Sequence, residues 1–186
     1  MREPVQTEVH RLVDLVLRQP QLDDGAPIWR LIKESETLDL NSPYCYLTLC
    51  HHFANTCVVA EDKDALVGFI VGYRPPNAQD IVVVWQIGVA ISRRGQGIGL
   101  AMLHELLRRD ACREVSFLEA TVTPSNIASR AIFTALARSL NAQWIQLAGF
   151  KDALFPKESC HEAEHLFRIG PFSAEQVQRA IVRNPL

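Results

Sequence analysis

The stretch SRRGQGIGLAMLHELL, from Ser92 to Leu107, places three glycines within five residues, behind two arginines and ahead of an apolar-periodic segment. Glycine lets a loop curl and lets its backbone approach an anion closely. Successive N–H groups and the positive end of the following helix then face one concavity, to which Arg93 and Arg94 add charge. The stretch predicts a phosphate-binding loop between a buried strand and a helix, the alternative being a glycine-rich turn without a ligand.

The glycine spacing argues against two kinds of phosphate site. A P-loop needs lysine followed by serine or threonine after its last glycine, whereas Gly99 is followed by leucine and alanine. A dinucleotide fingerprint needs G-x-G-x-x-G after a first strand, whereas Gly95, Gly97 and Gly99 follow the pattern G-x-G-x-G late in the chain. The pattern that remains is Arg94-x-x-Gly97-x-Gly99, which closes a strand and opens a helix.

The composition is typical of one globular domain with a small-metabolite ligand. The chain has 186 residues, 48% hydrophobic and 22% charged, with a formal net charge of -2, and this length suffices for one domain with a core. No basic tail or stripe indicates nucleic acid as a partner. The N-terminus lacks the apolar segment of a signal peptide, and the longest apolar run, 81–91, is too short to span a membrane. Five scattered cysteines predict reduced thiols in a cytoplasmic protein.

Hydrophobic periodicity predicts an α/β domain over residues 21–186, preceded by an N-terminal helical extension over residues 1–20. The extension rests on apolar residues at helical spacing between residues 5 and 19. The segment 80–91 reads as a fully buried strand, and 55–62 with 65–74 as a hairpin. The other expected elements are helices over 21–35, 43–53, 97–109, 124–140 and 173–184, and strands over 114–123, 142–150 and 164–170.

Two of these segments together carry a family resemblance. The glycine stretch resembles the pyrophosphate motif of the GNAT superfamily of N-acetyltransferases, Arg/Gln-x-x-Gly-x-Gly/Ala, and PSNIASRAIF (124–133) resembles its later motif, in which Asn126 would approach the pantetheine arm. The order of the expected strands and helices fits as well. The resemblance implies a mixed, twisted and splayed sheet of six to seven strands flanked by helices, with acetyl-CoA as cosubstrate.

Four segments resemble, more narrowly, the L-2,4-diaminobutyrate acetyltransferases of ectoine biosynthesis. They are LDLNSPYCYLTLCHHFANT (38–56), VWQIGVAISRRGQGIG (84–99), LEATVTPSNIASRAIF (118–133) and HEAEHLFRIGP (161–171), and the resemblance covers residues 22–171. It implies acetyl transfer to the γ-amino group of L-2,4-diaminobutyrate by a homodimer. The residues it assigns to acetyl-CoA are Ile87, Val89, Arg94, Gly95, Gln96, Gly97, Ile98, Gly99, Asn126 and Ser129.

The chemistry asks the site to hold a dication and to remove a proton from one amine, whose intrinsic pKa is about 10. Carboxylates serve the first task, and the matched segments offer Asp39 together with Glu162 or Glu164. If 164–169 is a strand, alternation places both glutamates on one face, so the choice between them stays open. Each acid has the alternative of being a solvated surface charge.

Aromatic residues in the same segments are further candidates for the substrate site. Trp85 would form a wall or a cation–π face for the diamine, with ordinary core packing as the alternative. Tyr44 and Tyr46, with Asn41 on the same turn, would orient the substrate, or one tyrosine would protonate the leaving thiolate. The alternative for the tyrosines is that they are amphipathic residues at a helix start.

The catalytic set expected from the resemblance is Tyr44, Glu164 and the backbone of Val89. A backbone N–H near Gly88 or Val89 would stabilise the oxyanion. Many relatives place a tyrosine acid where this sequence has Phe133, which has no proton to donate. A coenzyme A thiolate, with a pKa of about 8.5, leaves with little help. We therefore expect direct attack in a ternary complex, without an acyl-enzyme.

The first alternative is a GNAT acetyltransferase for another small diamine or amino acid, and two functions of other classes follow from the same residues. HEAEH satisfies the H-E-x-x-H pattern of zinc metalloproteases, with His161 and His165 as ligands and Glu162 as base, but the pattern requires a helix and 164–170 reads as a strand. Cys50 with the neighbouring His51 and His52 is no better placed, because adjacent residues point apart on a helix. No metal is expected. The third class is a noncatalytic acyl-CoA-binding domain.

Overall fold

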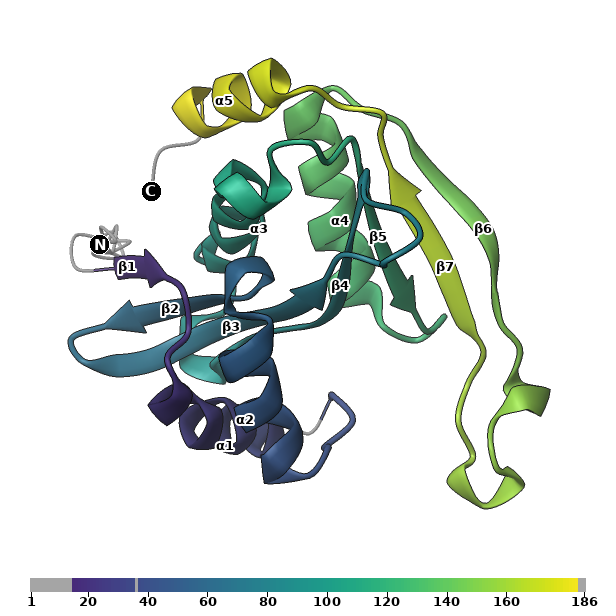
Figure 1. Cartoon of the computed structure of the whole chain (residues 1–186). Coiled ribbons are helices and arrows are strands. Elements are labelled where there is room, and N and C mark those ends of the chain that lie inside the picture. The colour runs from purple at the N-terminus through teal and green to yellow at the C-terminus, as the bar shows by residue number, and fades with distance from the viewer. Residues whose placement is uncertain (1–14, 36, 184–186) are drawn as a thin grey trace, which may run out of the picture.

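Seven strands form one mixed sheet in the computed structural model, which describes residues 15–35 and 37–183 (Figure 1). The sheet confirms the α/β class and the six to seven expected strands. Its spatial order is β1-β2-β3-β4-β5-β7-β6. The strands are β1 Leu15–Arg18, β2 Val58–Asp62, β3 Ala65–Tyr73, β4 Ile81–Val89, β5 Phe117–Val122, β6 Trp144–Phe150 and β7 Glu164–Ile169.

Helices cover both faces of the sheet. Alternate residues of β2 face opposite sides: Val59 packs in the cluster of α1 and α2, and Val58 in the cluster of α3, α4 and α5. The helices are α1 Gly25–Ser35, α2 Pro43–His52, α3 Ile98–Arg108, α4 Ile127–Leu140 and α5 Ala174–Arg183. Short 3-10 turns lie at Leu22–Asp24, Ala54–Thr56, Ile91–Arg93, Asp110–Cys112, Asp152–Leu154 and Lys157–Ser159.

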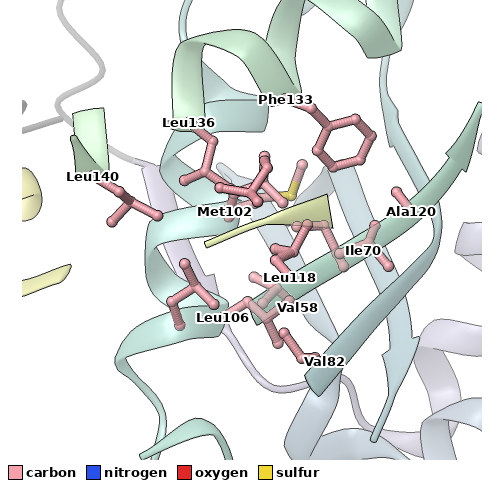
Figure 2. Packing of buried hydrophobic residues seen from close by; sticks show 14 of the residues in the cluster. Val58, Ile70, Val82, Met102, Leu106, Leu118, Ala120, Phe133, Leu136 and Leu140 are labelled. Atoms are coloured by element: carbon pink, nitrogen blue, oxygen red, sulfur yellow. The ribbon is translucent and has the colours of Figure 1, made fainter. Parts of the chain in front are cut away.

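The larger core lies between the sheet and helices α3 and α4 (Figure 2). Met102 and Leu106 on α3, and Leu136 on α4, have no exposed surface. They meet side chains of the central strands such as Ile70 and Leu118. This apolar layer fixes where α3 and α4 begin, and both N-termini carry predicted site residues.

The middle of the sheet splays apart between β4 and β5. These parallel strands pair over three positions, from Ile81 opposite Phe117 to Val83 opposite Glu119. Beyond Val83, β4 continues to pair with β3 up to Val89 opposite Gly68. The second half of β4 therefore has one edge without a strand partner among the described residues, as the resemblance implied.

Most expected elements are confirmed because their boundaries carry local signals. Ser42 caps α2, its Oγ accepting from the Cys45 N–H at 3.3 Å, and Asn126 caps α4. Lys63 and Asp64 take φ values of 49° and 65° in the β2–β3 turn, the positive pair that a tight hairpin favours.

Two expectations about segments are wrong. Leu15–Arg18 forms strand β1, antiparallel to β2, where we expected the end of a helix. The open edge of β2 and the Arg18 guanidinium, bonded to Glu61 at 3.0 Å and Asp24 at 2.7 Å, override local periodicity there. The sheet thus reaches into the expected extension, whose residues 1–14 lie outside the described residues. Strand β4 is also not fully buried, since Trp85 is 42% exposed. Within 15–35 and 37–183, no helix has the length and apolarity to cross a membrane.

Candidate active site

The glycine loop joins the end of β4 to α3. Gly95 and Gly97 have φ values of +76° and +81°, and a Cβ on either would meet open space. Both take the left-handed conformation that glycine adopts without strain. The first intrahelical hydrogen bond of α3 runs from the Ala101 N–H to the Gly97 carbonyl at 3.0 Å, so the N–H groups before Ala101 have no helical acceptor. The loop and the helix end together form an anion cradle.

A cavity of about 850 Å³, here the long pocket, runs from this loop between α3 and α4. Gly99 allows the close approach of the two helices, since a Cβ there would lie 2.2 Å from the Cδ1 of Ile132. The predicted cofactor residues that line the long pocket are Ile87, Val89, Arg94, Gly95, Gly97, Ile98, Gly99, Asn126 and Ser129. Gln96 does not line it, although its Oε1 is buried and unpaired among the described residues.

The two arginines before the glycines have different surroundings. Arg93 forms an ion pair with Asp62 on β2, which offsets its charge. Arg94 donates from Nε to the Val89 carbonyl at 3.3 Å and shows no ion pair within the described residues. Arg94 is therefore the cation of this pair that is free to meet a phosphate.

A second cavity of about 430 Å³, here the polar pocket, opens where β4 and β5 splay. Its walls come from the α1–α2 loop, from β4 and β5, and from the segment before β7. Predicted substrate residues that line it are Asp39, Asn41, Trp85, Glu162 and Glu164. Leu38, Ile87 and Ser129, among others, line both cavities. Ligands in the two cavities would therefore meet beside Ile87.

Glu164, the first residue of β7, has one carboxylate oxygen without a partner. Its Oε2 is buried and has no hydrogen bond among the described residues. Burial raises the pKa of this carboxyl above its usual range. A buried acceptor is costly unless a donor meets it, and an ammonium group in the polar pocket would supply that donor.

The Glu162 carboxylate, in contrast, has hydrogen-bond partners. This difference distinguishes the two glutamates, which alternation had placed on one face of a strand. β7 begins only at Glu164, so Glu162 lies in the preceding segment. Its carboxylate accepts from the Ser125 hydroxyl, and from the Ser125 N–H at 3.3 Å. Glu162 therefore ties this segment to the start of α4, while Glu164 keeps a free oxygen.

His161 joins the two acids of the polar pocket. Its Nε2 lies 3.1 Å from the Asp39 Oδ2 and 3.9 Å from the Glu164 Oε1. The ring stacks on Phe155 with centroids 4.1 Å apart. The Glu162 carbonyl, which accepts from Nδ1 at 2.7 Å, and the Asp39 carboxylate raise the pKa of His161. Sequence analysis considered His161 only as a zinc ligand and missed this contact, which spans 122 residues.

The three predicted aromatic residues lie in three different environments. Trp85 lines the polar pocket and is 42% exposed, so it is not core packing. Tyr46 has no exposed surface and lines neither cavity, so its contact with substrate stays a prediction. Tyr44 is 76% exposed and lines neither cavity, so the structure does not bring it to the other site residues.

The zinc alternative lacks the geometry that it needs. The H-E-x-x-H pattern places its histidines on one turn of a helix, but Glu164–Ile169 is a strand and His161 precedes it. No group of three or more histidine, cysteine, aspartate or glutamate side chains in the described ranges is arranged to hold a metal ion. His51 and His52 pack edge to face against each other, 4.4 Å between ring centroids.

The fold and the paired cavities define the class of protein. The model of the acetyltransferase (GNAT) family matches residues 24–137. Ard1 from Thermoplasma volcanium shares the fold, with a TM-score of 0.68 at 19% identity over 85% of this chain and 99% of that one. The chain therefore belongs to the acetyltransferase (GNAT) family.

Within that family, the proteins with higher sequence identity to this chain share one activity. The L-2,4-diaminobutyric acid acetyltransferase of Halalkalibacterium halodurans is 50% identical, over 84% of this chain and 82% of that protein. The one from Shouchella clausii is 49% identical, over 84% and 87%. The structure of the diaminobutyrate acetyltransferase EctA from Paenibacillus lautus, in complex with L-2,4-diaminobutyric acid and coenzyme A, matches with a TM-score of 0.83 at 44% identity over 85% and 95%. The chain is a member of the diaminobutyric acid acetyltransferases.

Proposed function

We propose that this enzyme transfers an acetyl group from acetyl-CoA to the γ-amino group of L-2,4-diaminobutyrate, in ectoine biosynthesis. The observation that carries the proposal is the unpaired, buried Oε2 of Glu164 in a small polar pocket that adjoins the glycine-loop cavity. The long pocket suits an extended cosubstrate with a pyrophosphate, because the anion cradle and Arg94 lie at one end of it. The polar pocket suits a small molecule with two ammonium groups.

Acidic side chains on both sides of the polar pocket support binding of a diamine. Asp39 lies on the α1–α2 loop and Glu164 on β7, and His161 links their carboxylates. Trp85 on β4 presents an exposed ring to the same pocket. Two carboxylates and an aromatic face match two ammonium groups on a short aliphatic chain.

Glu164 is the residue that we propose as general base. Burial raises the pKa of its carboxyl, which brings its proton affinity closer to that of an amine than an exposed glutamate's would be. The γ-ammonium group gives one proton to the free Oε2, and the resulting amine forms a bond to the acetyl carbonyl carbon. The C–S bond then breaks, and the departing thiolate takes up the second proton that the nitrogen loses. His161, whose Nε2 lies 3.9 Å from the other carboxylate oxygen, offsets part of this rise in the pKa of Glu164.

The backbone of Val89 is the proposed donor to the developing oxyanion. The Ala90 N–H donates to the Val67 carbonyl on β3 at 2.8 Å. Because neighbouring residues of a strand point their polar groups to opposite sides, the N–H of Val89 points away from β3. Arg94 reaches the Val89 carbonyl on that same side. The splay from β5 leaves the Val89 N–H facing the long pocket, which favours Val89 over Gly88.

Direct transfer fits the state of the cysteines better than an acyl-enzyme does. Burial raises the pKa of Cys50 to about 12, and of Cys57 and Cys112 to about 11. A thiol with so high a pKa is a poor nucleophile at neutral pH. Cys160 is the cysteine that lines the polar pocket, and the ternary-complex mechanism gives it no role.

The proposal extends to location and assembly. All five cysteines are free, which supports a reducing, cytoplasmic location. We expect a homodimer from the family resemblance, and the apolar side chains Ile145, Phe150 and Leu154 are exposed along β6 and the turn that follows it. Sedimentation of the purified protein tests the dimer.

An amine panel tests the proposed function. Thiol release from acetyl-CoA is measured with L-2,4-diaminobutyrate, ornithine, lysine and monoamines of similar length. We expect kcat/KM to be highest for diaminobutyrate, because the polar pocket is short and carries two acids. Equal turnover of many unrelated amines, or coenzyme A binding without any turnover, would contradict the proposal.

A further inference from the structure

Two buried polar side chains next to the polar pocket have no part in the proposed chemistry. Tyr46 on α2 has no exposed surface, and Gln86 on β4 is 7% exposed while lining the pocket. A buried hydroxyl or amide destabilises a fold unless its hydrogen bonds are made. The hydrogen-bond partners of Tyr46 and Gln86 therefore indicate the role of these two side chains.

These side chains close a ring of hydrogen bonds with the α1–α2 loop. The Asn41 N–H donates to the Tyr46 Oη at 3.2 Å, and the Tyr46 hydroxyl donates to the Gln86 Oε1 at 3.1 Å. Gln86 in turn donates from Nε2 to the Asp39 carbonyl at 2.8 Å. The three hydrogen bonds run in one direction from donor to acceptor, and hydrogen bonds in such a chain strengthen one another.

The ring holds the backbone on both sides of the carboxylate that faces His161. Asp39 and Asn41 lie in a loop without regular structure between α1 and α2, and the Asp39 carboxylate itself is mostly exposed. Its position is therefore set by the backbone anchors and by the contact with His161, and not by apolar packing. Trp29 adds an anchor from α1, donating from Nε1 to the Asn41 carbonyl at 3.2 Å.

We infer that Tyr46 and Gln86 are positioning residues, which fix the Asp39 carboxylate over the polar pocket and so set the affinity for the amine but not for acetyl-CoA. This inference rests on the proposed function. The polar ring touches Asp39 and Asn41, whereas the glycine loop and the α3 N-terminus are built by other residues. The effect of breaking the ring should therefore be confined to one substrate.

The first test removes one hydroxyl. In Tyr46→Phe, the KM for diaminobutyrate should rise about threefold to fivefold, within the range that follows from losing one hydrogen bond, while kcat and the KM for acetyl-CoA change less than about twofold. Gln86→Met, of similar length, breaks the ring at the next link and should give the same pattern. Tyr73→Phe is the matched control, because Tyr73 lies at the end of β3 outside both cavities and should leave both KM values unchanged.

The second test asks whether the effect passes through Asp39. In an Asp39→Ala background, Tyr46→Phe should have no further effect on the amine KM, because the carboxylate that it positions is gone. Amide hydrogen exchange of the 39–41 backbone should be faster in Tyr46→Phe than in the parental enzyme. A role limited to stability would give additive effects instead.

The outcomes separate the inference from the function on which it rests. A parental enzyme without diaminobutyrate turnover would refute the proposed function, and with it the role in amine binding. A parental enzyme that turns over, with an unchanged amine KM in Tyr46→Phe and Gln86→Met, would refute the positioning role alone. Equal rises in both KM values, or additive effects with Asp39→Ala, would overturn it as well.

Discussion

Replacing Glu164 by glutamine removes the proposed proton acceptor while keeping the shape of the side chain. The buried Oε2 of Glu164 lacks a partner among the described residues, so the amide would leave the amine without a base. A pH of 8 is about two units below the amine's pKa of about 10, so only about one amine in 100 is unprotonated. Removing the proton therefore costs about 2.7 kcal/mol, or a factor of about 100. We therefore expect kcat/KM to fall by at least about 100-fold, within the usual range for loss of a general base.

The pH profile distinguishes loss of a base from loss of packing. Glu164 titrates above the usual range of a glutamate because burial disfavours its charged form. Activity of the parental enzyme should fall as the pH drops through that raised pKa and the carboxylate is protonated. In Glu164→Gln, kcat/KM should instead rise about tenfold per pH unit toward about pH 10, because only the free amine reacts.

The assay is initial-rate thiol release from acetyl-CoA with diaminobutyrate, measured from about pH 4 to about pH 10 so that it covers the glutamate and the amine. Glu158→Gln is the matched control, since Glu158 lies on the β6–β7 connection before Glu164, is exposed and lines neither cavity. A Glu164→Gln enzyme within about threefold of the parental kcat/KM, or one with a parallel pH profile, would refute the reasoning.

Three further predictions address the other parts of the site. Asp39→Ala should raise the KM for diaminobutyrate about fivefold and leave the KM for acetyl-CoA unchanged, because one largely exposed carboxylate is lost; a change in the acetyl-CoA value alone would mean that the residue is wrongly assigned. Gly97→Ala should weaken acetyl-CoA binding about tenfold in titration calorimetry, because φ at +81° strains an L-residue; unchanged binding would show that the loop does not hold the cosubstrate. Cys160→Ser should keep the parental kcat, and intact mass of the parental enzyme mixed with acetyl-CoA alone should show no added acetyl group; an acetylated cysteine would contradict direct transfer.

Much of the fold could be predicted from local sequence signals. The glycine spacing at residues 95–99, the caps Ser42 and Asn126, and the hairpin turn at Lys63 each act over a few residues, so the helices and strands next to them were predictable. Strand β1 was not, because LVLR satisfies a helix as well as a strand. What decides it is the free edge of β2 and the contact of Arg18 with Glu61, 43 residues further along the chain.

The candidate site was predictable in its residue types and less so in its arrangement. Alternation placed Glu162 and Glu164 together, but the point where β7 begins and the hydroxyl of Ser125 separate them. Tyr44 and Tyr46 look alike in sequence, yet α2 turns one into solvent and the other into the core. The contact of His161 with Asp39 forms only when the sheet has brought the two segments together, so no local sequence pattern predicts it.

The nitrogen that receives the acetyl group is the most direct test of the account. The enzyme is incubated with L-2,4-diaminobutyrate and acetyl-CoA labelled with ¹³C at the acetyl carbonyl, and the product is examined by NMR. We expect a single product, with the labelled carbonyl coupled through its amide to the γ-methylene. A product acetylated at the α-nitrogen, or a mixture of the two, would contradict the placement of the amine between Glu164 and the end of β4.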